Sequence, residues 1–237
     1  MKYMFEFFRS KARLSWSQAA FSTLSFSQEG EDIILDKIFQ DINKGSDYKG
    51  FFVDIGAHHP LRFSNTYKFY QNGWRGINVD PLPGIKKAFD KVRSRDINLE
   101  LGISSANSYL NFYMFREPAF NTFDLKTMER VSQNHSELIE VKKIKTSSLG
   151  TILDQHLPKN QSVDFFSIDV EGLDFEVLSS NNWDRYTPKV IVVEQRSQRI
   201  DPSIFNSSVF RLLDKKEFYL YSKLCNSMIF VNKSIKL

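Results

Sequence analysis

Two acidic residues, Asp54 and Asp80, lie at the ends of two apolar segments that are typical of consecutive parallel strands. The first segment, residues 51–55, is almost continuously apolar, as expected of a strand buried on both faces. It leads to Gly56, where the backbone can approach a ligand closely. The Asp80 carboxylate can accept hydrogen bonds from both hydroxyls of a ribose. The sequence therefore predicts a nucleotide site at the carboxyl ends of these strands.

The turn after the first strand limits the kind of nucleotide. Its sequence is Gly56-Ala57-His58-His59-Pro60, which lacks the G-x-G-x-x-G pattern that holds a pyrophosphate. We therefore expect a cofactor with an adenosine but no diphosphate, which disfavours an NAD-dependent oxidoreductase. S-adenosylmethionine fits, because its sulfonium and amino-acid part need a shallow turn and polar anchors more than a cradle of amides. The alternative is an ordinary β-α-β unit with a glycine in its turn.

A further pair of carboxylates follows a strand predicted to end at residue 168. Asp169 and Glu171 come directly after it, at the edge where open α/β sheets bind their ligands. Methyl transfer to a hydroxyl requires removal of the proton, and a carboxylate within hydrogen-bond reach can serve as the base. Both residues are catalytic candidates. For Glu171 the alternative is a capping role at the helix expected from residue 173.

A metal site is a weaker possibility at the same edge. Glu194 ends the next predicted strand, residues 190–194, so Asp169 and Glu194 should face each other across neighbouring strand ends. Two such oxygen donors could hold Mg²⁺, which keeps several waters and takes few protein ligands.

Histidines offer another source of a base. His58 and His59 follow Gly56, and His58 could contact the acceptor or remove its proton. The alternative is that both histidines only shape the turn. His135 and His156 are expected at the surface.

These candidates need a fold that gathers strand ends at one edge. Predicted strands and helices alternate along most of the chain, which is typical of a parallel sheet with helices on both faces. A capping box at residues 25–28 predicts a helix that runs to about residue 43. Residues 108–146 depart from the alternation and are interpreted as an excursion near the site. The expected strands are 51–55, 76–80, 97–102, 163–170, 190–194 and a closing hairpin of 218–224 and 227–232, with helices near 65, 85–92, 149–156, 173 and 205–215.

Length and composition favour one α/β domain. With 237 residues, the chain can bury a sizeable core, and we expect a domain over residues 25–237 preceded by an extension, residues 1–24. Its single cysteine, Cys225, excludes an intramolecular disulfide and favours a reducing compartment. No apolar run reaches the roughly 18 residues of a membrane span. Charged residues interrupt the N-terminal segment, so it lacks the continuous apolar core of a signal peptide. We therefore predict a cytoplasmic protein.

The charge balance says little about partners. A net charge of +4 and a pI near 9.0 mildly favour an acidic partner such as a nucleotide-sugar, a nucleic acid or an anionic membrane, without selecting one. The extension mixes aromatic and basic side chains and could lie on a membrane surface. The alternative is a helix that packs on the domain or on a second subunit, so peripheral membrane contact and a homo-oligomer both stay open.

Six sequence blocks follow one another along the chain: SQEGEDIIL (27–35), FVDIGAHHP (52–60), FSNTYKFY (63–70), GWRGINVDPLPG (73–84), LELGIS (99–104) and SIDVEGLDFEVL (167–178). In this order they resemble the FkbM family of S-adenosylmethionine-dependent methyltransferases. Each block alone is weak, but together they are specific and cover roughly residues 25–233. The resemblance implies the class I methyltransferase (Rossmann-like) fold, with a mostly parallel seven-stranded sheet, a C-terminal antiparallel hairpin and helices on both faces.

The resemblance also implies the cofactor contacts. It places Asp54 and Gly56 near the methionine part, Asp80 on the ribose and residues 102–104 on the adenine side. Similar members are mostly linked to O-methylation of sugars and other secondary-metabolite hydroxyls, often in surface polysaccharide or antibiotic clusters. The implied cofactor-binding residues are Gln28, Glu29, Asp32, Asp54, Gly56, Asp80, Pro81, Gly102, Ile103, Ser104 and Asp169.

Two alternatives of other classes remain. An RNA or other nucleic-acid methyltransferase would share the cofactor site, but four net charges are few for a phosphate binder. A catalytically silent cofactor-binding assembly protein would keep the sheet and lose the acceptor chemistry, which the acidic strand ends argue against. Residues 1–21 and 105–146, expected to contact the acceptor, are the least motif-like. The sequence therefore predicts O-methylation of a sugar, glycan or related small molecule and does not identify the acceptor.

Overall fold

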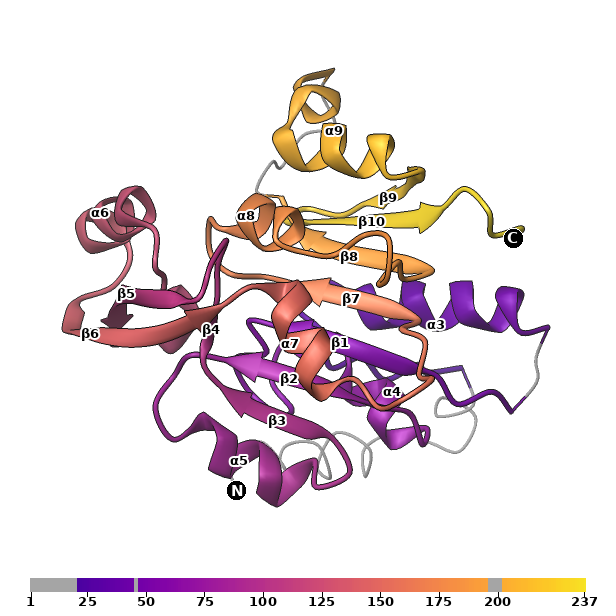
Figure 1. Ribbon diagram of the computed structural model, residues 1–237, viewed down its shortest axis with the longest axis horizontal. Helices are drawn as coiled ribbons and strands as arrows, with labels where there is room; N and C mark the ends of the chain where they lie inside the picture. Colours follow the sequence, from indigo (N-terminus) through magenta and orange to yellow (C-terminus); the bar gives the residue numbers. More distant parts are fainter. Residues whose placement is uncertain (1–20, 45–46, 196–201) are drawn as a thin grey trace.

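The computed structural model describes residues 21–44, 47–195 and 202–237. Most of the predicted N-terminal extension lies outside these residues. The described chain forms a seven-stranded sheet and a smaller three-stranded sheet (Figure 1). The strands are β1 (Phe51–Ile55), β2 (Arg75–Asp80), β3 (Ile97–Glu100), β4 (Gly102–Ile103), β5 (Ser108–Phe115), β6 (Leu138–Ser147), β7 (Phe165–Ile168), β8 (Val190–Glu194), β9 (Phe218–Lys223) and β10 (Ser227–Asn232). The helices are α3 (Glu31–Ile42), α4 (Tyr67–Gln71), α5 (Ile85–Val92), α6 (Leu125–Asn134), α7 (Leu149–His156), α8 (Asp174–Ser179) and α9 (Ser208–Lys215), with 3-10 helices η1 (Pro118–Phe120) and η2 (Pro202–Asn206).

The large sheet has the order β3-β2-β1-β7-β8-β10-β9. Strand β1 pairs in parallel with β2 on one side and β7 on the other, and β7 pairs in parallel with β8. Strand β10 is antiparallel to both of its neighbours, β8 and β9. The predicted parallel sheet with a closing antiparallel hairpin is therefore confirmed.

Helices cover both faces of this sheet. On one face, α3 and α4 contribute Leu35 and Phe69 to a buried cluster. On the other, α7, α8 and α9 contribute Leu153, Val177 and Leu213 to the largest cluster. Because each central strand is enclosed by helices on both sides, its sequence can be apolar throughout.

The central strand β1 shows this double burial directly. All five of its residues are buried. Phe52 packs into the cluster with α3 and α4, whereas Phe51, Val53 and Ile55 pack into the cluster with α7, α8 and α9. Asp54, the one acid in the strand, is therefore held near the middle of the sheet's carboxyl edge.

The first described helix begins later than the capping box predicted. Helix α3 starts at Glu31, with Gly30 at its N-cap in the left-handed region at φ 89°. The hydroxyls of Ser25 and Ser27 instead donate to the Asp32 carboxylate, at 2.6 and 2.9 Å. The prediction of a capping box that begins at Ser25 was wrong, because the Ser25 hydroxyl bonds the Asp32 side chain and it is the Ser27 hydroxyl that accepts from the Gly30 and Asp32 amides, at 3.1 and 3.4 Å.

The strand predicted over residues 97–102 is divided between two sheets. Strand β3 ends at Glu100, and Gly102 and Ile103 form β4, which pairs with β6. Strand β6 also pairs with β5 along its length, and the sequence reasoning had missed β6. Figure 1 shows this smaller sheet and α6 beyond the carboxyl ends of β1, β2 and β7. The excursion therefore lies where ligands of open α/β sheets bind.

Across the ranges that the structure describes, none of the helices combines the length and the apolar character needed to cross a bilayer.

Candidate functional site

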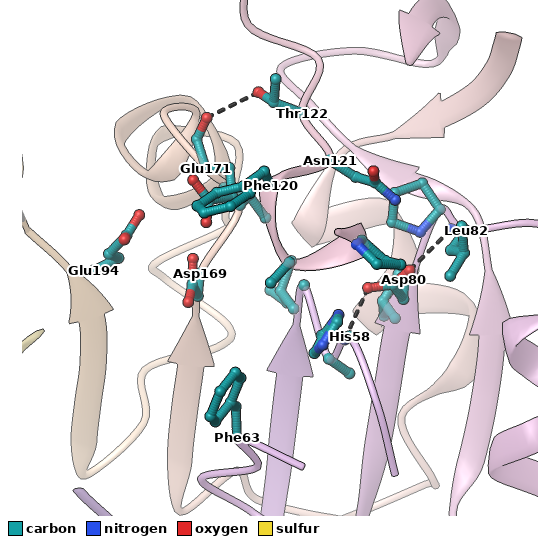
Figure 2. A pocket seen from close by; sticks show the side chains of 18 of the residues that line it. His58, Phe63, Asp80, Leu82, Phe120, Asn121, Thr122, Asp169, Glu171 and Glu194 are labelled. Atoms are coloured by element: carbon teal, nitrogen blue, oxygen red, sulfur yellow. Dashed lines mark hydrogen bonds between the residues drawn. The ribbon is translucent and has the colours of Figure 1, made fainter. Parts of the chain in front are cut away.

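A cavity of about 560 Å³ lies at the carboxyl ends of β1, β2, β7 and β8. This volume falls within the usual range for small-molecule sites. The strand ends form its floor, and the segment from Glu117 to Phe123 forms much of its outer wall. Figure 2 shows His58, Asp80, Asp169 and Glu194 as they emerge from the strand ends. Residues far apart in sequence therefore share one cavity.

Asp80 is a hydrogen-bonded acid in the floor of the cavity. One carboxylate oxygen accepts from the amide of His58 and the other from the amide of Leu82, each at 2.8 Å (Figure 2). Burial raises the pKa of Asp80 to about 6, and the hydrogen bonds from these two amides oppose the rise. Each carboxylate oxygen can accept a further hydrogen bond, so Asp80 is oriented by the turn and still able to bind a ligand hydroxyl.

Gly56 lies in the left-handed region, at φ 76°. A Cβ atom at this position would be 1.7 Å from the carbonyl oxygen of Asp169. The glycine is therefore required by the close approach of the segments after β1 and β7, as well as by its backbone conformation. The sequence predicts a glycine here for the approach of a ligand, and the structure gives it this packing role as well.

Asp54 lines the cavity although it is only 4% exposed. Its carboxylate accepts from the Thr66 hydroxyl at 2.6 Å, and that hydroxyl in turn accepts from the guanidinium of Arg93 at 2.9 Å. Burial raises the pKa of Asp54, and the positive charge of Arg93 opposes this rise. A buried network behind the cavity therefore sets the orientation of Asp54.

Three carboxylates gather where β7 and β8 end. Oxygen atoms of Asp169, Glu171 and Glu194 all lie within 4.8 Å of one another. The structure thus brings together the pair expected for a metal and adds Glu171 to it. Glu171 has a left-handed φ of 54°, and its carbonyl accepts from the Thr122 hydroxyl at 2.8 Å (Figure 2).

Asp174 organises the turn that carries these carboxylates, and sequence reasoning had missed it. It is the first residue of α8 and directly follows the N-cap residue, Leu173. Glu171 is therefore not the N-cap residue. The buried Asp174 carboxylate accepts from the Val170 amide at 3.3 Å. Burial and the charge of Glu194 raise the pKa of Asp174 to about 7. The acid therefore helps to hold the loop between β7 and α8.

The two adjacent histidines differ in role. His58 lines the cavity, and its Nε2 atom is buried without a hydrogen-bond partner among the described residues. Burial and nearby Arg62 lower the pKa of His58 to about 4, so this imidazole is neutral at pH 7. His59 shapes the turn, because its Nδ1 accepts from the amides of Leu61 and Arg62 at 3.1 and 2.9 Å.

The outer wall contains residues that the sequence patterns did not reveal. Phe120 and His135 line the cavity, and their rings stack at a centroid distance of 5.8 Å and 27°. His135 is exposed, as expected, but it supports the wall. Arg62 and Glu117 also line the cavity and form an ion pair at 3.0 Å. An aromatic residue followed by a capped helix at Asp124 was the only local signal of this arrangement.

Only some of the cofactor-binding residues implied by the resemblance line the cavity. Gln28, Pro81 and Ile103 line it, in addition to the strand-end residues described above. Four of the implied residues are not among its lining residues: Glu29, Asp32, Gly102 and Ser104.

Local contacts explain these four positions. Glu29 accepts from the backbone and side-chain amides of Asn226, at 2.9 and 2.6 Å. Asp32 is buried beneath the segment before α3. A Cβ atom on Gly102 would be 2.6 Å from the Phe123 ring, and the amide of Ser104 donates to the Ser147 carbonyl at 2.9 Å. Their contacts therefore support the walls rather than form them.

Comparisons with known proteins agree with this architecture. A family model described as the methyltransferase FkbM domain matches residues 54–214, more than half of the chain. The comparison with curated proteins gives no match. The fold is the class I methyltransferase fold, as predicted from the sequence.

The solved structures to which the chain is similar have little sequence identity to it. A TehB-like SAM-dependent methyltransferase from Corynebacterium glutamicum is 9% identical, with 98% of this chain and 100% of that chain covered and a TM-score of 0.42. Precorrin-6y C5,15-methyltransferase from Geobacter metallireducens is 12% identical, with 84% and 85% covered and a TM-score of 0.41. The N-terminal domain of human METTL16 is 8% identical, with 84% and 68% covered and a TM-score of 0.43.

Proposed function

The chain belongs to the family of FkbM methyltransferase domains, and from this premise we propose that it methylates a hydroxyl of a sugar, glycan or related small molecule. S-adenosylmethionine is the methyl donor that the family implies. The observation that supports the proposal is a single cavity whose floor contains Asp80 on one strand end and Asp169 on another. A cofactor anchor and a candidate base are thus within one site.

The residues present fit S-adenosylmethionine. Asp80 has free acceptor capacity for the ribose hydroxyls. Leu82, Leu101 and Ile103 give the cavity an apolar wall next to Asp80, which suits an adenine ring. We expect the Asp54 carboxylate, at the neighbouring strand end, to face the positively charged methionine part. When bound, the cofactor supplies an electrophilic methyl group on its sulfonium.

The base is assigned to the acidic cluster. As the acceptor oxygen forms its bond to the methyl carbon, the carbon–sulfur bond breaks and the hydroxyl proton must leave. We propose that Asp169 accepts this proton. Glu171, which lies beside it, and His58 are the other two candidates for the base. His58 is neutral at pH 7 with a pKa of about 4, so it is about as basic as an ordinary carboxylate. We prefer Asp169 because open α/β sheets bind their ligands at the strand ends.

The same cluster could also hold Mg²⁺. Asp169, Glu171 and Glu194 offer three hard oxygen ligands close together, which is the ligand type that Mg²⁺ prefers. A bound cation would orient the acceptor hydroxyl and lower its pKa. The role of Asp169 would then be that of a ligand rather than a base.

Isothermal titration of the purified protein tests the cofactor before any acceptor is known. S-adenosylmethionine and S-adenosylhomocysteine should bind, and NAD⁺ should not. Asp80→Ala should weaken binding at least tenfold, whereas Asp184→Ala, which removes an exposed acid outside the cavity, should leave it unchanged. Equal binding by both variants would overturn the assignment of Asp80.

Acceptor screening tests the second half of the proposal. Release of S-adenosylhomocysteine should be stimulated by hydroxylated sugars and not by RNA oligonucleotides. Stimulation by RNA alone would replace the proposal with a nucleic-acid methyltransferase. Cofactor binding without turnover on any acceptor would favour a silent assembly protein.

A further inference from the structure

Phe63 and Phe120 are two of the four phenylalanines that line the cavity, and neither is assigned to the cofactor. Phe63 comes from the turn after β1, and Phe120 from the end of η1 in the excursion. In the view of Figure 2, the Asp169 carboxylate lies between these two rings. The two rings and the proposed base therefore line the same cavity.

The backbone at Phe63 suggests that its ring has a function. Phe63 has a left-handed φ of 57°, which is a genuine outlier for a bulky residue. Its side chain is 41% exposed, so burial of the ring does not compensate for the strain. Such strain is concentrated at ligand-binding sites, and here it directs an aromatic side chain into a cavity.

Both rings are held by neighbouring planar groups. The guanidinium of Arg62 lies 4.3 Å from the centre of the Phe63 ring, and His58 stacks on it at 6.4 Å and 20°. His135 supports Phe120. The ion pair between Arg62 and Glu117 ties together the segments that carry the two rings. Each ring is therefore oriented by a neighbouring planar group before any acceptor binds.

We propose that Phe63 and Phe120 form the acceptor subsite, and that the acceptor presents a ring with an apolar face, such as a pyranose. This inference rests on the proposed methyltransferase function. A pyranose has C–H groups on its faces and hydroxyls around its edge. The electron-rich aromatic faces attract the C–H groups, while the edge hydroxyls can reach the Asp169 carboxylate. An acyclic polyol has the same hydroxyls but lacks the rigid apolar face.

Saturation-transfer NMR in the presence of S-adenosylhomocysteine tests this subsite. The probes are the methyl pyranosides of glucose, galactose, mannose and rhamnose, each compared with its alditol. At least one pyranoside should give a saturation signal fivefold or more above that of its alditol, strongest at the protons of one ring face. No pyranoside exceeding its alditol, including no binding by either, would overturn the inference.

Three variants assign the signal to the two rings. Phe63→Leu and Phe120→Leu keep an apolar side chain and remove the aromatic face, so each should reduce the pyranoside signal at least fivefold. Phe63→Asn should do the same with less backbone strain, because asparagine tolerates the left-handed region. Phe175→Leu is the control, since this partly exposed phenylalanine on α8 lies outside the cavity. An unchanged signal in the first two variants would overturn the inference.

The affinity for S-adenosylhomocysteine separates the two proposals. It should stay within twofold of the wild-type value in all the variants, which also shows that they are folded. If the wild-type protein fails to bind S-adenosylhomocysteine, the proposed function fails. If it binds the nucleoside and shows no preference for pyranosides, only the acceptor subsite fails.

Discussion

Replacing Arg93 with methionine should lower the free energy of unfolding by about 3–5 kcal/mol, the usual cost of removing one partner of a buried ion pair. The Arg93 guanidinium donates to the Asp96 carboxylate at 2.9 Å, and both side chains are 0% exposed. Methionine keeps the flexible apolar stem, so the cost comes mainly from the uncompensated charge. Asp96 would keep its hydrogen bonds from the Gly76 amide and the Asn78 side chain but lose its counter-ion.

Thermal and urea unfolding would measure this loss. For a domain of this size, each kcal/mol shifts the melting temperature by about 2–4 °C, so a shift of roughly 6–20 °C is expected. Arg95→Met is the matched control, because Arg95 is exposed and stacks at 4.1 Å on Tyr70, a ring that Arg93 also contacts. The control should cost about 1 kcal/mol or less. A loss below about 1 kcal/mol for Arg93→Met would refute the reasoning.

A double-mutant cycle separates the ion pair from simple loss of packing. Asp96→Asn combined with Arg93→Met should cost less than the sum of the single variants, because it removes the unpaired buried charge. The coupling should fall within about 0.5–3 kcal/mol. Strict additivity would show that the charge of Asp96 is not what makes Arg93 necessary.

The same replacement should affect the cofactor site. Arg93 bonds Thr66, which bonds Asp54, and its positive charge opposes the rise in the pKa of Asp54. Without it, the pKa of Asp54 should rise further, and the affinity for S-adenosylhomocysteine at neutral pH should fall. Arg95→Met should leave that affinity unchanged. An unaltered affinity in Arg93→Met would restrict the role of Arg93 to stability.

Three further predictions concern the chemistry of the site. Because the pKa of Asp80 is raised to about 6, S-adenosylhomocysteine should bind more tightly as the pH rises through 6; Asp80→Asn should flatten this titration, and an unchanged profile would contradict the assignment. Asp169→Asn should leave cofactor affinity nearly intact and reduce turnover at least about 100-fold, whereas retained turnover would point to His58 or Glu171. If Mg²⁺ is bound by Asp169 and Glu194, a chelator should abolish turnover and added Mg²⁺ should restore it; an unchanged rate would remove the metal from the mechanism.

The parts of the fold that the sequence predicted well are those whose burial determines their composition. Residues 51–55 and 190–194 form strands with the predicted bounds, as their continuous apolar sequences imply. Helices α5 and α7 also match. The start of α3 did not, because a serine hydroxyl can either cap a helix or bond a nearby side chain, and here the Ser25 hydroxyl donates to the Asp32 carboxylate. Local sequence does not distinguish between them.

The site also has a part that the sequence predicts, its floor, and a part that it does not, its outer wall. The floor could be predicted because parallel strands bring their carboxyl ends to one edge, so an acid after each strand points to a shared site. The outer wall depends on contacts between distant segments. Thr122 exchanges backbone hydrogen bonds with Tyr113 at 2.8 and 3.1 Å and donates its hydroxyl to the Glu171 carbonyl. These bonds position the segment that bears Phe120, and they follow no local periodicity.

This division has a functional consequence. The blocks that resemble the FkbM family supply the floor with its proposed cofactor anchor and base, and one block also supplies Phe63 of the proposed acceptor subsite. Phe120 and His135 lie in the stretch that matches none of those blocks, yet their stacked rings form the wall on the acceptor side. Changes there can alter the acceptor without disturbing the strand ends. Acceptor specificity should therefore follow the excursion between β4 and β6, and substitutions in it should change acceptor preference while leaving S-adenosylhomocysteine affinity constant.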